Sequence, residues 1–434
     1  IGLTGLVWGM VKSVERRKDM QDALLKEEKA RLVAEQTAYT ATIGTVQAAI
    51  ANKSWEMARH HLAATHRNQR GWEWNYLQGM VDQSIRKWLI GDRPISLATA
   101  PNGRHLAVSF DGGRVVLIDE ERNISRDLSL PSRVRSMEFA NNSELLLMGM
   151  ADGKIALLDL EKDTLMFIRG GISSVESITM LEGGAYATGH TDGFVRYWSS
   201  DGDVTYEVDC GSGMVLSLAY DQARSRLAIG TADGTVQVWK IDSDTPMMKT
   251  WGHSGEAHVV LFLPDGTLIS AGDDDKLVVW NARSMKKMTS IDSNHGGILD
   301  VALSGNRIAS VGMDGVVRLW SLPAYALLEE LRGHGDFIWS IGSLGDGRIV
   351  SVGRDGSIRW WDASGRQPTA VEISTTMPVS DIAFVWNEVL VAVSEFDSRI
   401  QVVNVQTGES RKIPSKVDHV LTTVEFVPTT SAVI

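Results

Sequence analysis

The stretch Arg348–Asp362, which reads RIVSVGRDGSIRWWD, combines two strand patterns with a tight turn between them. The apolar run Ile349–Val352 is typical of a buried strand, and a second strand is predicted to end at Trp361-Asp362. Between the two, Asp355-Gly356 tolerates the positive φ angles that a two-residue hairpin turn requires. The stretch therefore predicts a β-hairpin.

The same pattern recurs along most of the chain. Similar hairpins are predicted at Ala187–Ser199, Ser270–Asn281 and Ser310–Ser321, and a weaker copy around Asp111-Gly112 brings the number of units to eight. The other seven turn aspartates lie 40, 41, 41, 40, 41 and 42 residues apart, and they are Asp152, Asp192, Asp233, Asp274, Asp314, Asp355 and Asp397. A period of about 40–45 residues with four strands per unit is the sequence signature of a β-propeller.

The units also resemble the repeats of WD-repeat (WD40) proteins, and the resemblance covers Ser84–Ile434. Each unit opens with an inner strand of the Val-x-x-Ile-x-Phe type, as at Val379, Ile382 and Phe384. The Trp-Asp pair that names the family is intact at Trp361-Asp362, whereas several other units keep only the Trp. The resemblance implies a mainly β fold: a WD40-type β-propeller of seven or eight four-stranded blades, preceded by a helical stalk and module.

Two alternatives remain for the closure of the ring. Ile85–Ile90, before the first unit, can supply the outer strand of the last blade. Unit eight, however, has a candidate outer strand of its own at Ser410–Pro414, and His419–Ile434 begins a ninth unit. Either eight blades form one ring, which we favour, or seven blades close and unit eight starts a second, truncated propeller.

The N-terminal region differs from the repeats. Ile1–Val11 is apolar but shorter than the roughly 20 residues that span a bilayer; we expect it to be the end of a transmembrane helix, the alternative being a short buried helix or a frayed end. Lys12–Gln36 has mixed charges and neither Gly nor Pro, which predicts a stalk helix. Thr40–Ser84 predicts a small module of three helices. The expected division is residues 1–11, 12–83 and 84–434.

Part of this module carries a second resemblance. Arg70–Leu77 (RGWEWNYL), together with Ala58-Arg59 and Leu62, resembles the segment that joins a transmembrane helix to WD repeats in planctomycete-type bacterial receptor serine/threonine kinases. In that family the kinase lies N-terminal to the membrane helix. The present sequence contains no Gly-rich loop, His-Arg-Asp or Asp-Phe-Gly motif. The resemblance thus implies a region that follows a kinase, and no enzyme activity is expected of this chain.

Three units share a set of Ser, His, Asp and Trp in which Ser precedes Asp by four residues and Trp follows Asp by six. A hydrolase triad occurs once per active site, whereas this set recurs once per unit. The set also resembles the hydrogen-bond tetrad of WD repeats, in which a closed network satisfies buried polar groups. We predict structural tetrads and no catalytic residue; the members are His253, Ser270, Asp274 and Trp280; His295, Ser310, Asp314 and Trp320; and His334, Ser351, Asp355 and Trp361.

No metal site or cofactor is predicted. His61 and His66 are five residues apart and do not share a helix face, which favours solvated histidines at His60, His61 and His66. Asp273-Asp274-Asp275 lacks the alternating ligands of a calcium loop and is interpreted as a turn with extra surface charge. The single cysteine, Cys210, excludes an internal disulfide and a cysteine-based zinc site.

The charge distribution limits the class of partner. The formal net charge is −11; residues 1–83 hold 11 Lys and Arg against 9 Asp and Glu, so the remainder holds 32 against 45. An acidic propeller is poorly suited to a phosphate backbone, so we expect no nucleic acid. A protein or peptide is expected on the face that holds the Asp-Gly turns. Candidate contact residues are Trp339, Phe337, Arg354, His190 and Trp251.

These observations favour a non-catalytic interaction or sensing propeller, as the C-terminal part of a membrane-anchored bacterial signalling kinase. The alternatives are a free-standing soluble scaffold and an enzymatic propeller that uses its central channel, for which the sequence offers no cofactor motif. The side of the membrane stays open. Lys12, Arg16, Arg17 and Lys18 favour a cytoplasmic propeller, whereas the kinase resemblance implies the opposite side.

Overall fold

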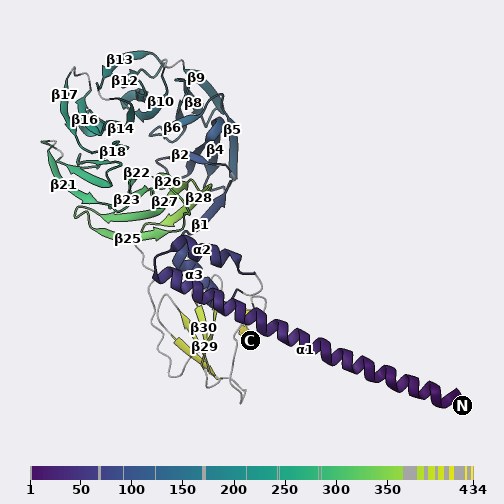
Figure 1. Ribbon diagram of the computed structural model, residues 1–434. Helices are drawn as coiled ribbons and strands as arrows, with labels where there is room; N and C mark the ends of the chain where they lie inside the picture. Colours follow the sequence, from purple (N-terminus) through teal and green to yellow (C-terminus); the bar gives the residue numbers. More distant parts are fainter. Residues whose placement is uncertain are drawn as a thin grey trace. The chain divides into compact units, whose positions relative to one another are not determined.

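The computed structural model shows two compact units (Figure 1). One is residues 82–366, and the other holds the N-terminal helices and the strands after residue 366. The residues described are 2–66, 70–90, 92–122, 124–168, 173–211, 213–241, 243, 245–281, 283–284, 286–364, 379–385, 390–395, 399–404, 410–414, 426–427 and 432–433. Side chains are described within these ranges except for residues 2–15, 72, 124 and those beyond 364.

Residues 82–366 form seven antiparallel four-stranded sheets, the blades of a propeller arranged around a common centre (Figure 1). The first three blades are β2–β5 (Pro94–Thr99, His105–Phe110, Arg114–Asp119, Ile124–Ser129), β6–β9 (Val134–Phe139, Leu145–Met150, Ile155–Asp159, Thr164–Ile168) and β10–β13 (Val175–Met180, Tyr186–His190, Phe194–Trp198, Val204–Asp209). The next three are β14–β17 (Val215–Asp221, Arg226–Thr231, Thr235–Lys240, Pro246–Trp251), β18–β21 (Val259–Phe262, Leu268–Ala271, Lys276–Trp280, Lys287–Asp292) and β22–β25 (Ile298–Ser304, Arg307–Gly312, Val316–Ser321, Leu327–Arg332).

The seventh blade joins both ends of this unit. Its inner strands are β26–β28 (Ile338–Ser343, Arg348–Gly353, Ser357–Asp362), and its outer strand is β1 (Arg86–Leu89), which pairs antiparallel with β28 from Arg86↔Trp360 to Leu89↔Ser357. Trp88 packs edge-to-face on Trp360, with ring centroids 5.6 Å apart, and the Arg86 guanidinium lies over both rings. The segment before the first unit therefore completes the last blade of the ring, which is one of the two alternatives that the sequence left open.

The favoured eight-blade ring is wrong, because β1 occupies the edge of blade seven and closes the ring there. Unit eight folds as a separate four-stranded sheet, β29–β32 (Val379–Val385, Leu390–Glu395, Arg399–Asn404, Ser410–Pro414), in the other compact unit. The start of a ninth unit falls mostly outside the described residues, which show there the short pair β33 (Phe426–Val427) and β34 (Ala432–Val433). The turn predicted at Asp397 also lies outside them.

The core of the propeller is divided among the blade interfaces. Seven buried apolar clusters each join two neighbouring blades, and one of them joins blade seven to blade one. Alternation along β28 explains how one strand serves two interfaces: Trp360 packs toward blade one, and Trp361 packs toward blade six. Burial of both strand faces accounts for the near-continuous apolar runs in the sequence.

The N-terminal helices form a small core of their own. The stalk helix and the first module helix are one continuous helix, α1 (Gly2–Ala51), because no Gly or Pro between Lys12 and Thr40 interrupts it. It packs with α2 (Trp55–Ala64) and α3 (Trp72–Val81). The buried residues are Tyr39, Ile43, Val46, Ala49, Ala58, Leu62, Leu77 and Val81. Among the described residues, no helix combines the length and apolar character that a membrane span needs.

Candidate functional site

The predicted His and Asp residues lie in or next to loops at one end of the blades, which we call the upper face, whereas the Ser and Trp members of the tetrads and Trp339 lie in strands. Because each blade is an antiparallel meander, two kinds of loop meet there. One kind joins the second and third strands of a blade, as Gly272–Asp275 does in blade five; the other leads into an inner strand, as Gly252–His258 does. The upper face is therefore built from short loops held by rigid strands.

Hydrogen bonds join the four members of each predicted tetrad in blades five, six and seven. In blade five, the Trp280 indole N–H donates to Ser270 Oγ (2.9 Å), Ser270 lies 2.7 Å from His253 Nε2, and His253 Nδ1 lies 2.8 Å from Asp274 Oδ1. The same three contacts measure 2.8, 2.9 and 2.8 Å in blade six, and 2.8, 2.7 and 3.0 Å in blade seven. The further members are His295, Ser310, Asp314 and Trp320, and His334, Ser351, Asp355 and Trp361.

This geometry does not suit nucleophilic catalysis. The Ser270, Ser310 and Ser351 side chains are fully buried, and each hydroxyl oxygen already accepts an indole N–H. A substrate carbonyl could reach the oxygen only if the Trp and its strand moved away. The arrangement instead ties an upper loop to the second and third strands of its blade.

Burial controls the charge states in these networks. It lowers the pKa of His253 and His334 below the ordinary imidazole value, which keeps both rings neutral at pH 7. Burial alone would raise the pKa of Asp355, but hydrogen bonds from His334, Ser357 and the Gly335 N–H outweigh it and lower that pKa below its usual range. Asp355 is thus the fixed anion of the blade-seven tetrad.

Blade three contains a variant of this network and corrects one candidate contact residue. His190 is fully buried, so it is not available to a partner in this structure. Its Nε2 lies 2.7 Å from Thr188 Oγ1, which accepts the Trp198 indole N–H at 2.7 Å. Thr188 precedes Trp198 by the same ten residues that separate Ser from Trp in the tetrads, so this spacing could have identified it from the sequence.

In blade four, the tryptophan indole N–H donates its hydrogen bond to a glutamine instead of a hydroxyl group. The Trp239 indole N–H donates to Gln237 Oε1 (2.9 Å), and Gln237 Nε2 donates to the Cys210 carbonyl (2.9 Å). This unit is not among the three in which the sequence predicts a tetrad, and it lacks His and Ser at those positions. A single glutamine instead links the indole to the loop that enters the blade.

An aromatic and charged cluster lies on blade seven. Phe337 and Trp339 pack edge-to-face with ring centroids 6.0 Å apart, and the Arg354 guanidinium lies 5.7 Å from the Phe337 ring centre. Arg354 also approaches Asp336, with Nε 3.7 Å from Oδ2. Trp339 is 37% exposed although it belongs to an inner strand. We call these four residues the blade-seven cluster.

A second exposed aromatic lies at the end of the outer strand of blade four. Trp251 is 82% exposed and borders a hollow of about 390 Å³. Lys249, Asp233 and Thr235 also line this hollow, and Lys249 Nζ donates to the Cys210 carbonyl at 2.7 Å. A large aromatic surface beside fixed polar groups is typical of a protein-binding surface.

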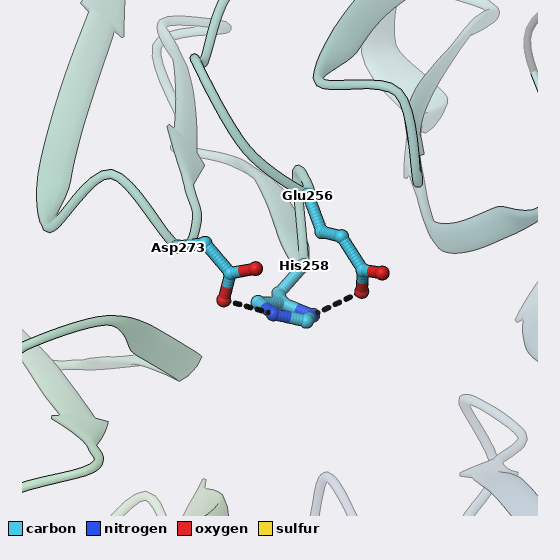
Figure 2. A group of neighbouring side chains, drawn as sticks. All are labelled: Glu256, His258 and Asp273. Carbon is cyan, nitrogen blue, oxygen red and sulfur yellow. Dashed lines mark hydrogen bonds and ion pairs between the residues drawn. The ribbon is translucent and has the colours of Figure 1, made fainter.

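Three potential metal ligands meet on blade five (Figure 2). His258 Nε2 lies 2.8 Å from Asp273 Oδ1, and His258 Nδ1 lies 3.8 Å from Glu256 Oε2. One ligand atom from each residue lies within 4.8 Å of the other two. In the sequence, Asp273 stands out only beside its neighbours Asp274 and Asp275. Glu256 and His258 are not recognisable as ligands there, because one-residue spacing in a loop is not a known motif.

Comparisons with known proteins agree with this architecture. The WD domain, G-beta repeat profile matches residues 203–240, 245–281, 286–321 and 326–362, within blades three to seven. One chain of a crystal structure of the mitotic checkpoint complex is similar over 64% of this chain and 95% of its own, with a TM-score of 0.61 and 17% identity, a likeness of fold alone. The chain thus forms a seven-bladed β-propeller that contains WD40 repeats.

Curated relatives are similar over part of their length. Apoptotic protease-activating factor 1 of Rattus norvegicus is 23% identical over 236 residues, which cover 51% of this chain and 19% of that protein. The WD repeat-containing protein 91 homolog of Dictyostelium discoideum is 34% identical over 170 residues, which cover 36% of this chain and 22% of that protein. The chain therefore spans about a fifth of the length of these relatives.

Proposed function

We propose that the propeller is a non-catalytic interaction domain that binds a protein or peptide on its upper face. The blade-seven cluster carries this proposal, because it leaves Trp339 partly exposed beside an arginine. Aromatic and arginine side chains dominate the binding energy of many protein interfaces. The tetrads already hold the upper loops in place, so binding a partner would cost less conformational entropy in these loops. We further propose that nucleic acid is not the partner, because the region after residue 83 holds 32 Lys and Arg against 45 Asp and Glu.

Peptides selected against the full chain from a random display library test this proposal. Affinity of a selected peptide is then measured by fluorescence anisotropy for the wild type, Trp339→Ala and Arg354→Ala. Leu327→Ala is the matched control, since Leu327 is 47% exposed on an outer strand away from the upper loops. We expect at least about a tenfold loss in Trp339→Ala and no change in the control. Peptides that bind all variants equally would refute the upper-face assignment.

We also propose that the propeller belongs to a membrane-anchored bacterial signalling kinase. The supporting observations are the apolar segment Ile1–Val11, the charged helix that follows it, and the similarity of Arg70–Leu77 to the juxtamembrane region of such kinases. Under this proposal the propeller senses or recruits, and the kinase elsewhere in the protein supplies the chemistry. The test is the coding sequence upstream of Ile1: a full apolar helix preceded by a kinase domain is expected, and an initiator Met with nothing apolar before it would leave the free-standing scaffold.

A further inference from the structure

We propose that Glu256, His258 and Asp273 form a divalent transition-metal site on the upper face of blade five (Figure 2). The two carboxylates approach the imidazole from different sides, Asp273 at Nε2 and Glu256 nearer Nδ1. Imidazole with carboxylate oxygen is a ligand set suited to zinc and its neighbours, whereas calcium prefers six to eight oxygens. The site is distinct from the blade-seven cluster and from the tetrads.

The aspartates around the site have separate roles. Asp274 is committed to the tetrad through His253 and also accepts the Ser254 N–H at 3.2 Å. Asp275 accepts the Ser293 hydroxyl and the His295 N–H, which fixes the next loop. Asp273 instead directs its carboxylate to His258. Its role is thus not explained by either structural network.

The backbone holds the ligands in place. The Asp273 N–H donates to the Glu256 carbonyl at 3.1 Å, which joins the two loops. A Cβ on Gly272 would lie 2.1 Å from that carbonyl oxygen, and a Cβ on Gly255 would lie 2.7 Å from the Asp273 Cβ. Both glycines are therefore required for this close approach, and the ligand-bearing loops are pre-organised by rigid strands.

The separation of His258 and Asp273 fits an ion with little rearrangement. Two ligands at about 2.0–2.1 Å from a tetrahedral or octahedral ion lie about 2.9–3.4 Å apart. The His258 Nε2 to Asp273 Oδ1 separation is 2.8 Å, so an ion can replace the proton between them after a small outward movement. Rotation of the Glu256 side chain brings in the third ligand. The side chains of His258, Glu256 and Asp273 are 20%, 40% and 37% exposed, which leaves access for the ion and for water ligands.

Calorimetric titration of the chelator-stripped full chain with Zn²⁺ alone tests the proposal. We expect one saturable site in the wild type and at least about a tenfold weaker affinity in both His258→Gln and Asp273→Asn. The matched controls are His60→Gln, an exposed histidine of α2, and Asp292→Asn, whose side chain is 77% exposed on the same blade. Both controls should bind as the wild type does.

Thermal unfolding in chelator establishes that each variant is folded, and Glu256→Gln provides an independent test if either ligand variant is not. Equal Zn²⁺ affinity in the wild type and in the folded ligand variants would overturn the proposal, because binding would then occur elsewhere. Absence of saturable binding to the wild type would overturn it as well. Neither outcome affects the peptide-binding proposal, which uses different residues and a different ligand.

Discussion

At the scale of single residues, position relative to the strands decides the role of each polar side chain. Asp273, Asp274 and Asp275 are identical and consecutive, yet they face His258, His253 and the Ser293–His295 loop respectively. Successive residues of a tight turn point in different directions, so neighbouring carboxylates reach different loops. A charge run in the sequence is therefore not evidence that its members act together.

The two aspartates of this turn provide an internal comparison. Asp274→Ala removes the acceptor of both the His253 Nδ1–H and the Ser254 N–H, and the histidine is buried. We expect the free energy of unfolding to fall by about 2–4 kcal/mol. Asp273→Ala, at a partly exposed position outside the tetrad, should change it by less than about 0.5 kcal/mol. Urea unfolding followed by tryptophan fluorescence measures both.

Asp355→Ala in blade seven should lower the free energy of unfolding by a similar amount, because Asp355 makes the same contacts with His334 and the Gly335 N–H. Equal stability of Asp274→Ala and Asp273→Ala would contradict the structural role of the tetrad.

Two partly buried carboxylates, Glu138 and Asp300, link neighbouring blades and should make stability depend on pH. Glu138 of blade two accepts the Met180 N–H of blade three at 3.2 Å, and Asp300 of blade six accepts the Ile341 N–H of blade seven at 2.9 Å. Burial raises the pKa of Glu138 to about 7 and that of Asp300 to about 6, although these hydrogen bonds oppose the shift. The folded protein thus holds protons that the unfolded chain releases at lower pH.

We therefore expect the free energy of unfolding to decrease as the pH rises from 4.5 to about 7, because Glu138 keeps its proton in the folded protein over this interval and loses it in the unfolded chain. The native state binds more protons in this interval, so each rise in pH favours the unfolded chain, by a total of the order of 1–3 kcal/mol. Glu138→Gln keeps a carbonyl acceptor and removes the charge, so the pH dependence should become flatter. Urea midpoints measured across this range test it, with Glu161→Gln, at an exposed position, as the control. An unchanged pH dependence in Glu138→Gln would show that Glu138 is ionised in the folded state.

At the scale of elements, local patterns predicted the hairpins but not their assembly. The Asp-Gly turns and alternating apolar residues define second and third strands such as β27 and β28, because these signals lie within a dozen residues. Closure depends on whether β1 or a later segment pairs with β28, and both candidates look like strands. The burial of His190 was missed for a related reason: whether a histidine beside a turn points inward depends on contacts with a neighbouring loop.

The contribution of β1 can be measured at two adjacent residues. Trp88 packs on Trp360 and beneath Arg86, whereas Leu89 is 71% exposed on the same strand. Trp88→Ala should lower the free energy of unfolding by about 2–4 kcal/mol, through lost packing at the ring closure. Leu89→Ala should change it by less than about 0.5 kcal/mol. Similar values for the two variants in urea unfolding would mean that β1 does not stabilise the ring.

At the scale of the whole molecule, a repeat count does not determine the number of blades. Eight units share one period, but seven interfaces already form a closed cycle in which β2 contacts β26 and β27. Polar contacts also close the ring at the end of the blades opposite the upper face. Glu120 of blade one accepts the Trp360 indole N–H at 3.1 Å and forms an ion pair with Arg348 at 3.1 Å. With both neighbours of every blade present, an additional repeat has no interface left to join in this ring.

This closed cycle predicts that residues 82–366 fold without the rest of the chain. All residues of the seven apolar clusters lie within this range. A fragment of residues 82–366 therefore keeps both neighbours of every blade, and no cluster becomes exposed because a neighbouring blade is missing. The fragment should therefore unfold within about 5 °C of the corresponding transition in the full chain, measured by scanning calorimetry. A fragment of residues 92–366, which lacks β1 and the Asp82–Arg359 ion pair, is the matched control and should unfold at least about 10 °C lower. If both fragments were equally unstable, the ring would need residues outside 82–366, and if both were equally stable, β1 would not be the strand that closes it.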